Sequence, residues 1–223
     1  MISTTLPDEL ELSELSARFE TAPAGAVVRW AWERFGPDGL VMASSFQDCV
    51  LIDVVATVAP GIEVVFLDTG FHFSETMEYL EQVRDRYDLK LRVVGPVLPP
   101  DEWPCGTAQC CQLRKVEPLN RVLEGRQAWM TGLRRAEADT RTEAPIVAID
   151  AARGVVKVNP LATWSDLDVE GYERDHDLPR HPLREHGYLS IGCAPTTAPV
   201  TPGEDARAGR WRGSDKTECG IHL

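Results

Sequence analysis

Apolar and polar residues follow one another in blocks that predict strands and helices in turn. Segments 50–58 and 74–86 carry apolar residues at helical spacing. The segments around them are short apolar runs of strand length, at 40–43, 62–67, 89–94 and 128–131. Strands that alternate with helices predict an α/β domain with a mainly parallel, three-layer sheet.

Further elements are predicted on both sides of this alternating region. Residues 10–19 and 24–35 have the spacing of two amphipathic helices, and the second ends at the turn formed by residues 36–39. Apolar runs at 146–149 and 155–158 flank a turn and predict a hairpin. Residues 96–104 are rich in proline and predict a linker.

Polar residues follow the first two predicted strands. Ser44, Ser45 and Gln47 come after the first strand, and Asp68 and Gly70 come after the second. Ligands of open α/β sheets bind at the carboxyl ends of the strands, so these residues are candidate contacts for a phosphate group. A serine cluster that caps the next helix explains Ser44 and Ser45 equally well.

The adjacent residues Cys110 and Cys111 open another predicted helix. Apolar residues recur after them at helical spacing, so both cysteines lie in the first turn, where the helix dipole favours thiolate. Thiolates bind metals or attack electrophiles, and Lys115 supplies a nearby cation. The alternative is a pair of small buried apolar side chains.

Composition narrows the class of protein. The chain has 223 residues and a net charge of −12, which argues against a broad nucleic-acid-binding surface. The cations gather in short groups suited to a small anion, at Arg114/Lys115, Arg134/Arg135/Arg141 and Arg207/Arg210/Arg212. Six cysteines without a secretory signal indicate metal or redox chemistry rather than a disulfide framework.

Localisation and domain organisation follow from the same composition. No apolar run is long enough for a membrane span, and residues 1–20 are acidic, so we expect a cytoplasmic protein. Residues 1–200 are predicted to form one domain with N-terminal helices. Residues 201–223 offer little for a core and are expected to form a C-terminal tail that is mobile or folds over something.

Several separated motifs together resemble the assimilatory adenylyl-sulfate and phosphoadenylyl-sulfate reductases. They run in family order from residue 40 to the end of the chain. The motifs are Ser44-Ser45-Phe46-Gln47, Leu67-Asp68-Thr69-Gly70, Cys110-Cys111-Gln112-Leu113-Arg114-Lys115, Thr131-Gly132-Leu133-Arg134-Arg135, Ser190-Ile191-Gly192-Cys193 and Lys216-Thr217-Glu218-Cys219-Gly220-Ile221-His222.

The resemblance implies a nucleotide-binding fold related to the ATP pyrophosphatases, and a reaction. Cys219 would attack the sulfur of adenylyl sulfate, AMP would leave, and thioredoxin or a similar dithiol protein would release sulfite from the S-sulfocysteine. The residues expected to bind the substrate are Ser44, Ser45, Gln47, Asp68, Gly70, Lys115, Arg134, Arg135 and Arg141.

The chain departs from the family at one cysteine. Relatives that reduce adenylyl sulfate typically hold a [4Fe-4S] cluster with an adjacent cysteine pair and a later Cys-x-x-Cys, but here Cys193 is followed by Thr196 at the last position. A threonine hydroxyl is a poor ligand for iron beside thiolates. Three arrangements remain: a cluster on Cys110, Cys111 and Cys193 alone, Cys105 as the fourth ligand, or no cluster.

The retained cysteines favour adenylyl sulfate as the substrate, since the resemblance links the cluster to that nucleotide. Two alternatives remain. One is a phosphoadenylyl-sulfate reductase, and the other is an iron–sulfur sensor without turnover.

Overall fold

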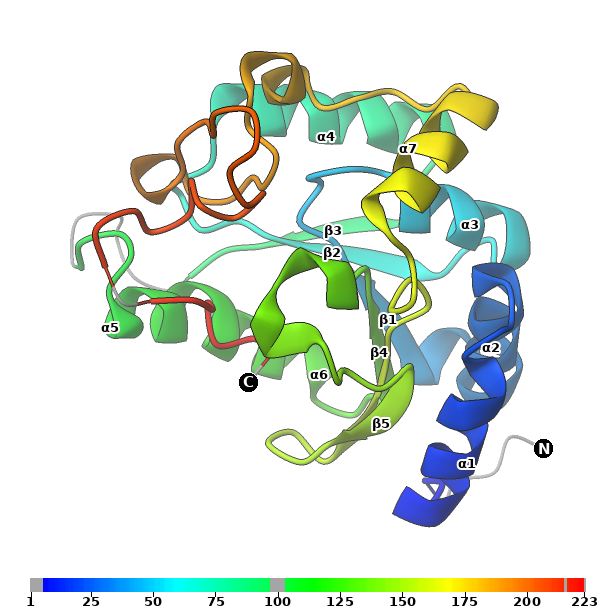
Figure 1. Ribbon diagram of the computed structural model, residues 1–223. Coiled ribbons are helices and arrows are strands. Elements are labelled where there is room, and N and C mark those ends of the chain that lie inside the picture. Colours follow the sequence, from blue (N-terminus) through cyan, green and yellow to red (C-terminus); the bar gives the residue numbers. More distant parts are fainter. Residues whose placement is uncertain (1–5, 97–102, 215, 223) are drawn as a thin grey trace.

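The computed structural model describes residues 6–96, 103–214 and 216–222. Its centre is a six-stranded sheet in the order β3-β2-β1-β4-β6-β5 (Figure 1). All neighbours pair in parallel except β5 and β6, which form the antiparallel hairpin. The strands are β1 (Leu40–Ala43), β2 (Glu63–Leu67), β3 (Leu91–Val94), β4 (Ala128–Thr131), β5 (Val147–Asp150) and β6 (Val155–Val158).

Side chains alternate between the two faces of the sheet and build two apolar clusters. In β1, Leu40 and Met42 join the larger cluster, whereas Val41 between them joins the smaller one. This alternation is the period-two pattern of a strand that is buried on both faces.

The helices complete a three-layer arrangement (Figure 1). The larger cluster is covered by α1 (Glu9–Phe19), α2 (Ala24–Gly39), α3 (Val50–Val58), α4 (Ser74–Tyr87) and α7 (Asp166–Asp175). On the opposite face, α5 (Ala108–Cys111) continues through a π-helical turn, Gln112–Val116, into α6 (Glu117–Leu123). The elements agree with the predicted ones to within a few residues at their ends, and α2 extends to Gly39 across a non-helical Gly36.

The strand order determines where a ligand can bind. The chain passes from β1 to β2 on one side of β1, whereas β4 lies on its other side. The loops after β1 and β4 therefore diverge at this point, which is where open α/β sheets bind ligands. Ser44, Ser45 and Gln47 belong to the first of these loops, and residues 132–141 belong to the second.

The C-terminal segment packs against the domain although it contains no helix or strand in the described part. Ala198 N–H donates to Gly209 O and Trp211 N–H donates to Thr196 O, both at 2.9 Å. The tail then runs along α5 and α6 (Figure 1), where Ile221 joins the smaller apolar cluster. Within the described ranges, no helix combines the length and apolar character that a bilayer span needs. The predicted linker 96–104 lies largely outside the described residues.

Candidate active site

A cavity opens at the carboxyl ends of β1 and β4, and loops from both strands line it. Ser44, Ser45 and Gln47 come from the loop after β1, and Gly132 and Leu133 follow β4. Gln47 also binds Ile191 of the cavity lining, because its Oε1 accepts a hydrogen bond of 2.8 Å from Ile191 N–H. The cavity thus occupies the switch point that the strand order creates.

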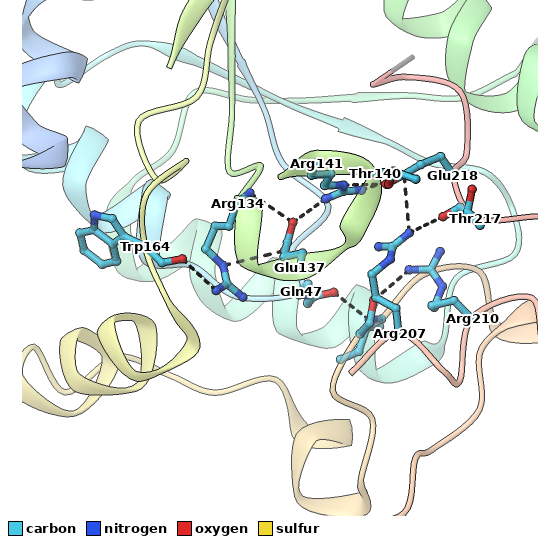
Figure 2. A network of polar contacts seen from close by, with 12 residues as sticks. Gln47, Arg134, Glu137, Thr140, Arg141, Trp164, Arg207, Arg210, Thr217 and Glu218 are labelled. Atoms are coloured by element: carbon cyan, nitrogen blue, oxygen red, sulfur yellow. Dashed lines mark hydrogen bonds and ion pairs between the residues drawn. The ribbon is translucent and has the colours of Figure 1, made fainter. Parts of the chain in front are cut away.

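The C-terminal tail closes this cavity and brings Cys219 to it. Glu218 is buried and accepts hydrogen bonds from Arg141 Nε at 2.7 Å and Arg141 Nη2 at 2.8 Å. Arg207 Nη2 lies 3.5 Å from the same carboxylate and donates to Thr217 O at 2.9 Å. Figure 2 shows Arg141 and Arg207 both directed at Glu218. This network places Cys219 in the cavity wall.

Arg141 is also paired with Glu137 on the loop after β4. The guanidinium therefore lies between two carboxylates, and their charges outweigh burial and raise the pKa of Arg141. Burial raises the pKa of Glu218, but the hydrogen bond and charge of Arg141 outweigh it, so the pKa lies below its usual value. Arg141 therefore holds the tail in place, and the carboxylates of Glu137 and Glu218 balance its positive charge.

Lys115 and Arg210 also line the cavity, and neither forms an ion pair with a carboxylate among the described residues. Arg210 Nη1 donates to Ser190 Oγ at 3.3 Å, whereas its Nε is buried and has no hydrogen-bond partner in the described part of the chain. His222 lines the same cavity, is stacked on Trp129, and has an unpartnered Nδ1 by the same criterion. Buried polar atoms are normally satisfied, so these groups indicate an anionic or polar ligand.

Lys115 occupies a special position because it lines both this cavity and a smaller pocket behind it. It lies on the π-helical turn, a deformation that occurs often at functional sites. Burial alone would lower the pKa of Lys115, but Cys219, Cys193 and Cys111 outweigh it and raise the pKa. Lys115 is therefore a permanent cation between the two pockets.

The smaller pocket is lined by four cysteines, Cys105, Cys110, Cys111 and Cys193, all of them free thiols. Thr107 caps α5, since its Oγ1 accepts from Cys110 N–H at 3.1 Å. Cys193 lies 3.4 Å from Thr69 Oγ1, and its hydrogen bond with Cys105, together with Lys115, holds its pKa below the usual value. The described residues contain no group of three or more side chains arranged around a single metal ion.

The predicted site residues separate into two sets. The structure brings together Ser44, Ser45, Gln47, Lys115, Arg141 and Cys219 around one cavity. Asp68 and Gly70 do not line it: their turn follows β2, and Asp68 Oδ1 accepts from Gly70 N–H at 2.8 Å.

Arg134 and Arg135 also lie outside the cavity lining. Arg134 Nη2 donates to Asp166 at 2.8 Å and its Nη1 to Trp164 O. Arg135 forms a bidentate pair with Glu20 on α1, at 2.7 and 2.8 Å. Both guanidinium groups therefore tie the loop after β4 to neighbouring segments.

Comparison with known proteins agrees with this geometry. Residues 39–199 match the family described as the phosphoadenosine phosphosulfate reductase domain. A protein named adenosine 5'-phosphosulfate reductase from Mycolicibacterium smegmatis is 44% identical over 236 residues, covering 100% of both chains. This chain belongs to the phosphoadenosine phosphosulfate reductase family.

Solved structures confirm the predicted fold class for this reductase family member. A phosphoadenylyl-sulfate reductase from Candida auris, crystallised with phosphate, superimposes with a TM-score of 0.77 at 24% identity, covering 88% of this chain and 100% of that one. An FMN adenylyltransferase from Candida glabrata in complex with ATP has a TM-score of 0.62 at 16% identity, covering 88% and 68%. This chain therefore shares its fold with both of these proteins.

Among the cavity residues that were absent from the predicted substrate-binding set are Arg207, Arg210 and His222. The sequence signal for the arginines was their clustering near the C-terminus, but a segment without periodicity gives no indication of where it folds. Gly192 is the local reason that Arg210 fits, because a Cβ there would overlap its guanidinium group.

Proposed function

We propose that this protein reduces adenylyl sulfate to sulfite and AMP in sulfate assimilation. Family membership and the 44% identical relatives support the reaction. The observation that carries the proposal is the placement of Cys219 in one cavity with Lys115, Arg207 and Arg210, beside the loop after β1. A nucleophile surrounded by cations is suited to an electrophile whose oxygens are negative.

In the first step, the Cys219 thiolate attacks the sulfur of adenylyl sulfate. A bond forms between the two sulfur atoms, the bond from sulfur to the bridging oxygen breaks, and AMP leaves with that oxygen and its electron pair. Negative charge develops on the leaving phosphate, and Lys115 and Arg210 are positioned to stabilise it.

The remaining contacts divide between the two ends of the substrate. Ser44, Ser45 and Gln47 bind the nucleotide side, where the loop after β1 offers hydroxyl and amide groups. Asp68 and Gly70 form the neighbouring turn after β2. On the phosphosulfate side, Arg141 positions the tail while Arg134 and Arg135 hold the loop that carries Arg141.

In the second step, a dithiol protein of the thioredoxin type attacks the S-sulfocysteine. Its thiolate bonds to Cys219 Sγ and sulfite leaves; the second thiol of the donor then displaces Cys219, so the donor ends as a disulfide. The sulfonate is thereby reduced by two electrons, and the tail carries Cys219 between the two partners. The cytoplasm suits this chemistry because it keeps such thiols reduced.

The smaller pocket fits an iron–sulfur cluster by its donor chemistry. Four free thiols line it, and Lys115 and Lys216 place two positive charges beside them. A tetranuclear cluster places its cysteines on separate irons, unlike a single-ion site. Cys110, Cys111 and Cys193 would hold it, and the bound cluster would supply a compact charged group beside Lys115.

Sulfite release measured with thioredoxin and either nucleotide tests the proposed function. We expect sulfite from adenylyl sulfate, a slower rate with the 3′-phosphorylated nucleotide, and no sulfite from Cys219→Ser. Cys49→Ala is the matched control, because Cys49 is a buried residue of the larger apolar cluster and lies outside the cavity lining. Equal rates for wild type and Cys219→Ser would refute the proposal.

A further inference from the structure

The pocket behind Lys115 contains one thiol more than the three cysteines that this chain retains at the positions of the family pattern. Cys110 and Cys111 come from α5 and Cys193 from the turn that precedes Thr196, whereas Cys105 comes from the segment before α5. In this chain, Thr196 stands where the Cys-x-x-Cys pattern that begins at Cys193 has its second cysteine. The pocket nevertheless has four.

Cys105 lies against the residue that replaces the missing cysteine. Cys105, Cys193 and Thr196 all line the smaller pocket. The next residue, Gly106, has φ +97°, and a Cβ added to it would come within 2.8 Å of Thr196 Cγ2. Glycine therefore lets this segment pack directly on Thr196, so the Cys105 thiol occupies the space beside position 196.

Thr196 itself does not offer a donor comparable to a thiolate. Its hydroxyl donates a hydrogen bond of 3.3 Å to Cys193 O, which holds the short turn together. A hydroxyl also stays protonated near neutral pH, and hard oxygen donors suit iron less well than thiolates in a cluster. The role of Thr196 in this pocket is therefore to pack against residues 105 and 106.

The segment that carries Cys105 is held in place from the tail. Lys216 Nζ donates to Gly106 O at 3.0 Å and to Thr107 O at 3.4 Å. The same ammonium group lies 2.9 Å from Cys111 Sγ. One cation thus ties the Cys105 segment to the thiol pair, and the fourth thiol is fixed in the pocket rather than carried by an unattached loop.

We infer that Cys105 is the fourth cysteine ligand of the cluster, taking the place of the cysteine absent at position 196. The inference rests on the proposed cluster at Cys110, Cys111 and Cys193, and it assigns a ligand from a different segment of the chain. The thiol of Cys105, from the segment before α5, would thus replace the cysteine that is absent at position 196.

The test compares wild type with Cys105→Ser, with the double variant Cys105→Ser/Thr196→Cys, and with Cys49→Ala as a matched cysteine control. Each protein is purified anaerobically, and iron, sulfide and native mass are measured without turnover. Samples are then treated with one equivalent of ferricyanide and examined by electron paramagnetic resonance. Loss of one electron to ferricyanide, followed by release of one Fe²⁺ ion, converts a four-iron cluster into a three-iron cluster with its own signal.

We expect wild type and Cys49→Ala to hold about four irons and four sulfides per chain and to resist ferricyanide. Cys105→Ser should lose iron as isolated or give the three-iron signal at several times the wild-type yield. The double variant should restore resistance, since it returns a thiol to position 196. That rescue distinguishes a ligand from a residue that only supports folding.

Two results would overturn the inference. One is a Cys105→Ser protein with the iron content and ferricyanide resistance of wild type. The other is a wild-type protein without iron that nevertheless releases sulfite from adenylyl sulfate, which would leave the proposed reaction intact. Conversely, iron binding that depends on Cys105 in a protein without reductase activity would refute the proposed function and support the ligand assignment.

Discussion

Glu218 and Arg141 form a bidentate ion pair, with Arg141 Nε and Nη2 2.7 and 2.8 Å from the two carboxylate oxygens. One partner belongs to the C-terminal tail and the other to the loop after β4. Because Glu218 directly precedes Cys219, this pair sets the position of the nucleophile relative to the cavity. A buried ion pair therefore holds the tail against the loop after β4.

Replacing Glu218 with glutamine should weaken the attachment of the tail to the loop after β4. The amide keeps the shape of the side chain but removes the charge that Arg141 and Arg207 share, and such charged pairs are costly to break when buried. We expect the rate of Cys219 sulfonation to fall by about ten- to a hundredfold, which is roughly 1.4–2.8 kcal/mol. Single-turnover mass spectrometry measures this rate.

Glu204→Gln is the matched control for that change. Glu204 is an exposed tail carboxylate that pairs with Arg212, and exposed pairs contribute little. Sulfonation of this variant should proceed at the wild-type rate. An unchanged rate in Glu218→Gln would mean that the ion pair does not position Cys219.

Arg210→Met should lower kcat of the proposed reaction. Arg210 lines the same cavity as Lys115 and Cys219, and its buried Nε has no hydrogen-bond partner among the residues that the structure describes. Loss of one preorganised donor for developing negative charge typically lowers kcat by about a hundred- to a thousandfold. Arg212→Met, two residues away and exposed, should behave like wild type in the same steady-state assay. Equal kinetics for the two variants would exclude Arg210 from the substrate site.

Because of His181, the stability of the folded protein should depend on pH, separately from any effect of pH on catalysis. Its Nδ1 accepts from Leu183 N–H at 3.2 Å, so its Nε2–H donates to Thr76 Oγ1 at 2.9 Å. Burial lowers the pKa of His181 to about 4 from an ordinary value of 6.5. The unfolded chain therefore takes up a proton first as the pH falls, and stability is lost progressively from pH 6.5 to about pH 4.

The full effect of this histidine on the free energy of unfolding is on the order of 3 kcal/mol. Urea titrations at pH 7.5 and pH 5 should show a smaller difference for His181→Gln than for wild type. His186→Gln, an exposed histidine on the same turn, should retain the wild-type difference. A His181→Gln protein with the full wild-type pH dependence would contradict this assignment.

Local pattern was sufficient to predict most of the fold. The period-two burial of β1 and β2 and the helical spacing of α3 are determined by neighbouring residues, so the strand and helix ends are reproduced closely. The pattern predicted a mainly parallel sheet, but the strand order β3-β2-β1-β4-β6-β5 was not predicted from the sequence. The predicted helix break at residues 36–39 agrees with the non-helical Gly36, although α2 resumes after this kink and extends to Gly39.

The geometry of the candidate site was harder to predict from the sequence, because it depends on contacts between residues that lie far apart along the chain. Arg135 is engaged by Glu20, which lies 115 residues away along the chain. Arg210 enters the cavity only because the tail folds back over Gly192. Neither relationship leaves a periodic signal, so the motifs predicted which segments meet but not which guanidinium group faces the ligand.

Attack of Cys219 on the sulfur of adenylyl sulfate would leave a sulfonate group on the protein, which intact mass spectrometry detects. Protein purified without oxygen is incubated with adenylyl sulfate, or with its 3′-phosphorylated form, in the absence of any thiol donor. We predict one added sulfonate group, mapped to Cys219 by peptide analysis, formed faster with adenylyl sulfate and absent in Cys219→Ser. No adduct with either nucleotide, or an adduct on another cysteine, would show that Cys219 is not the nucleophile.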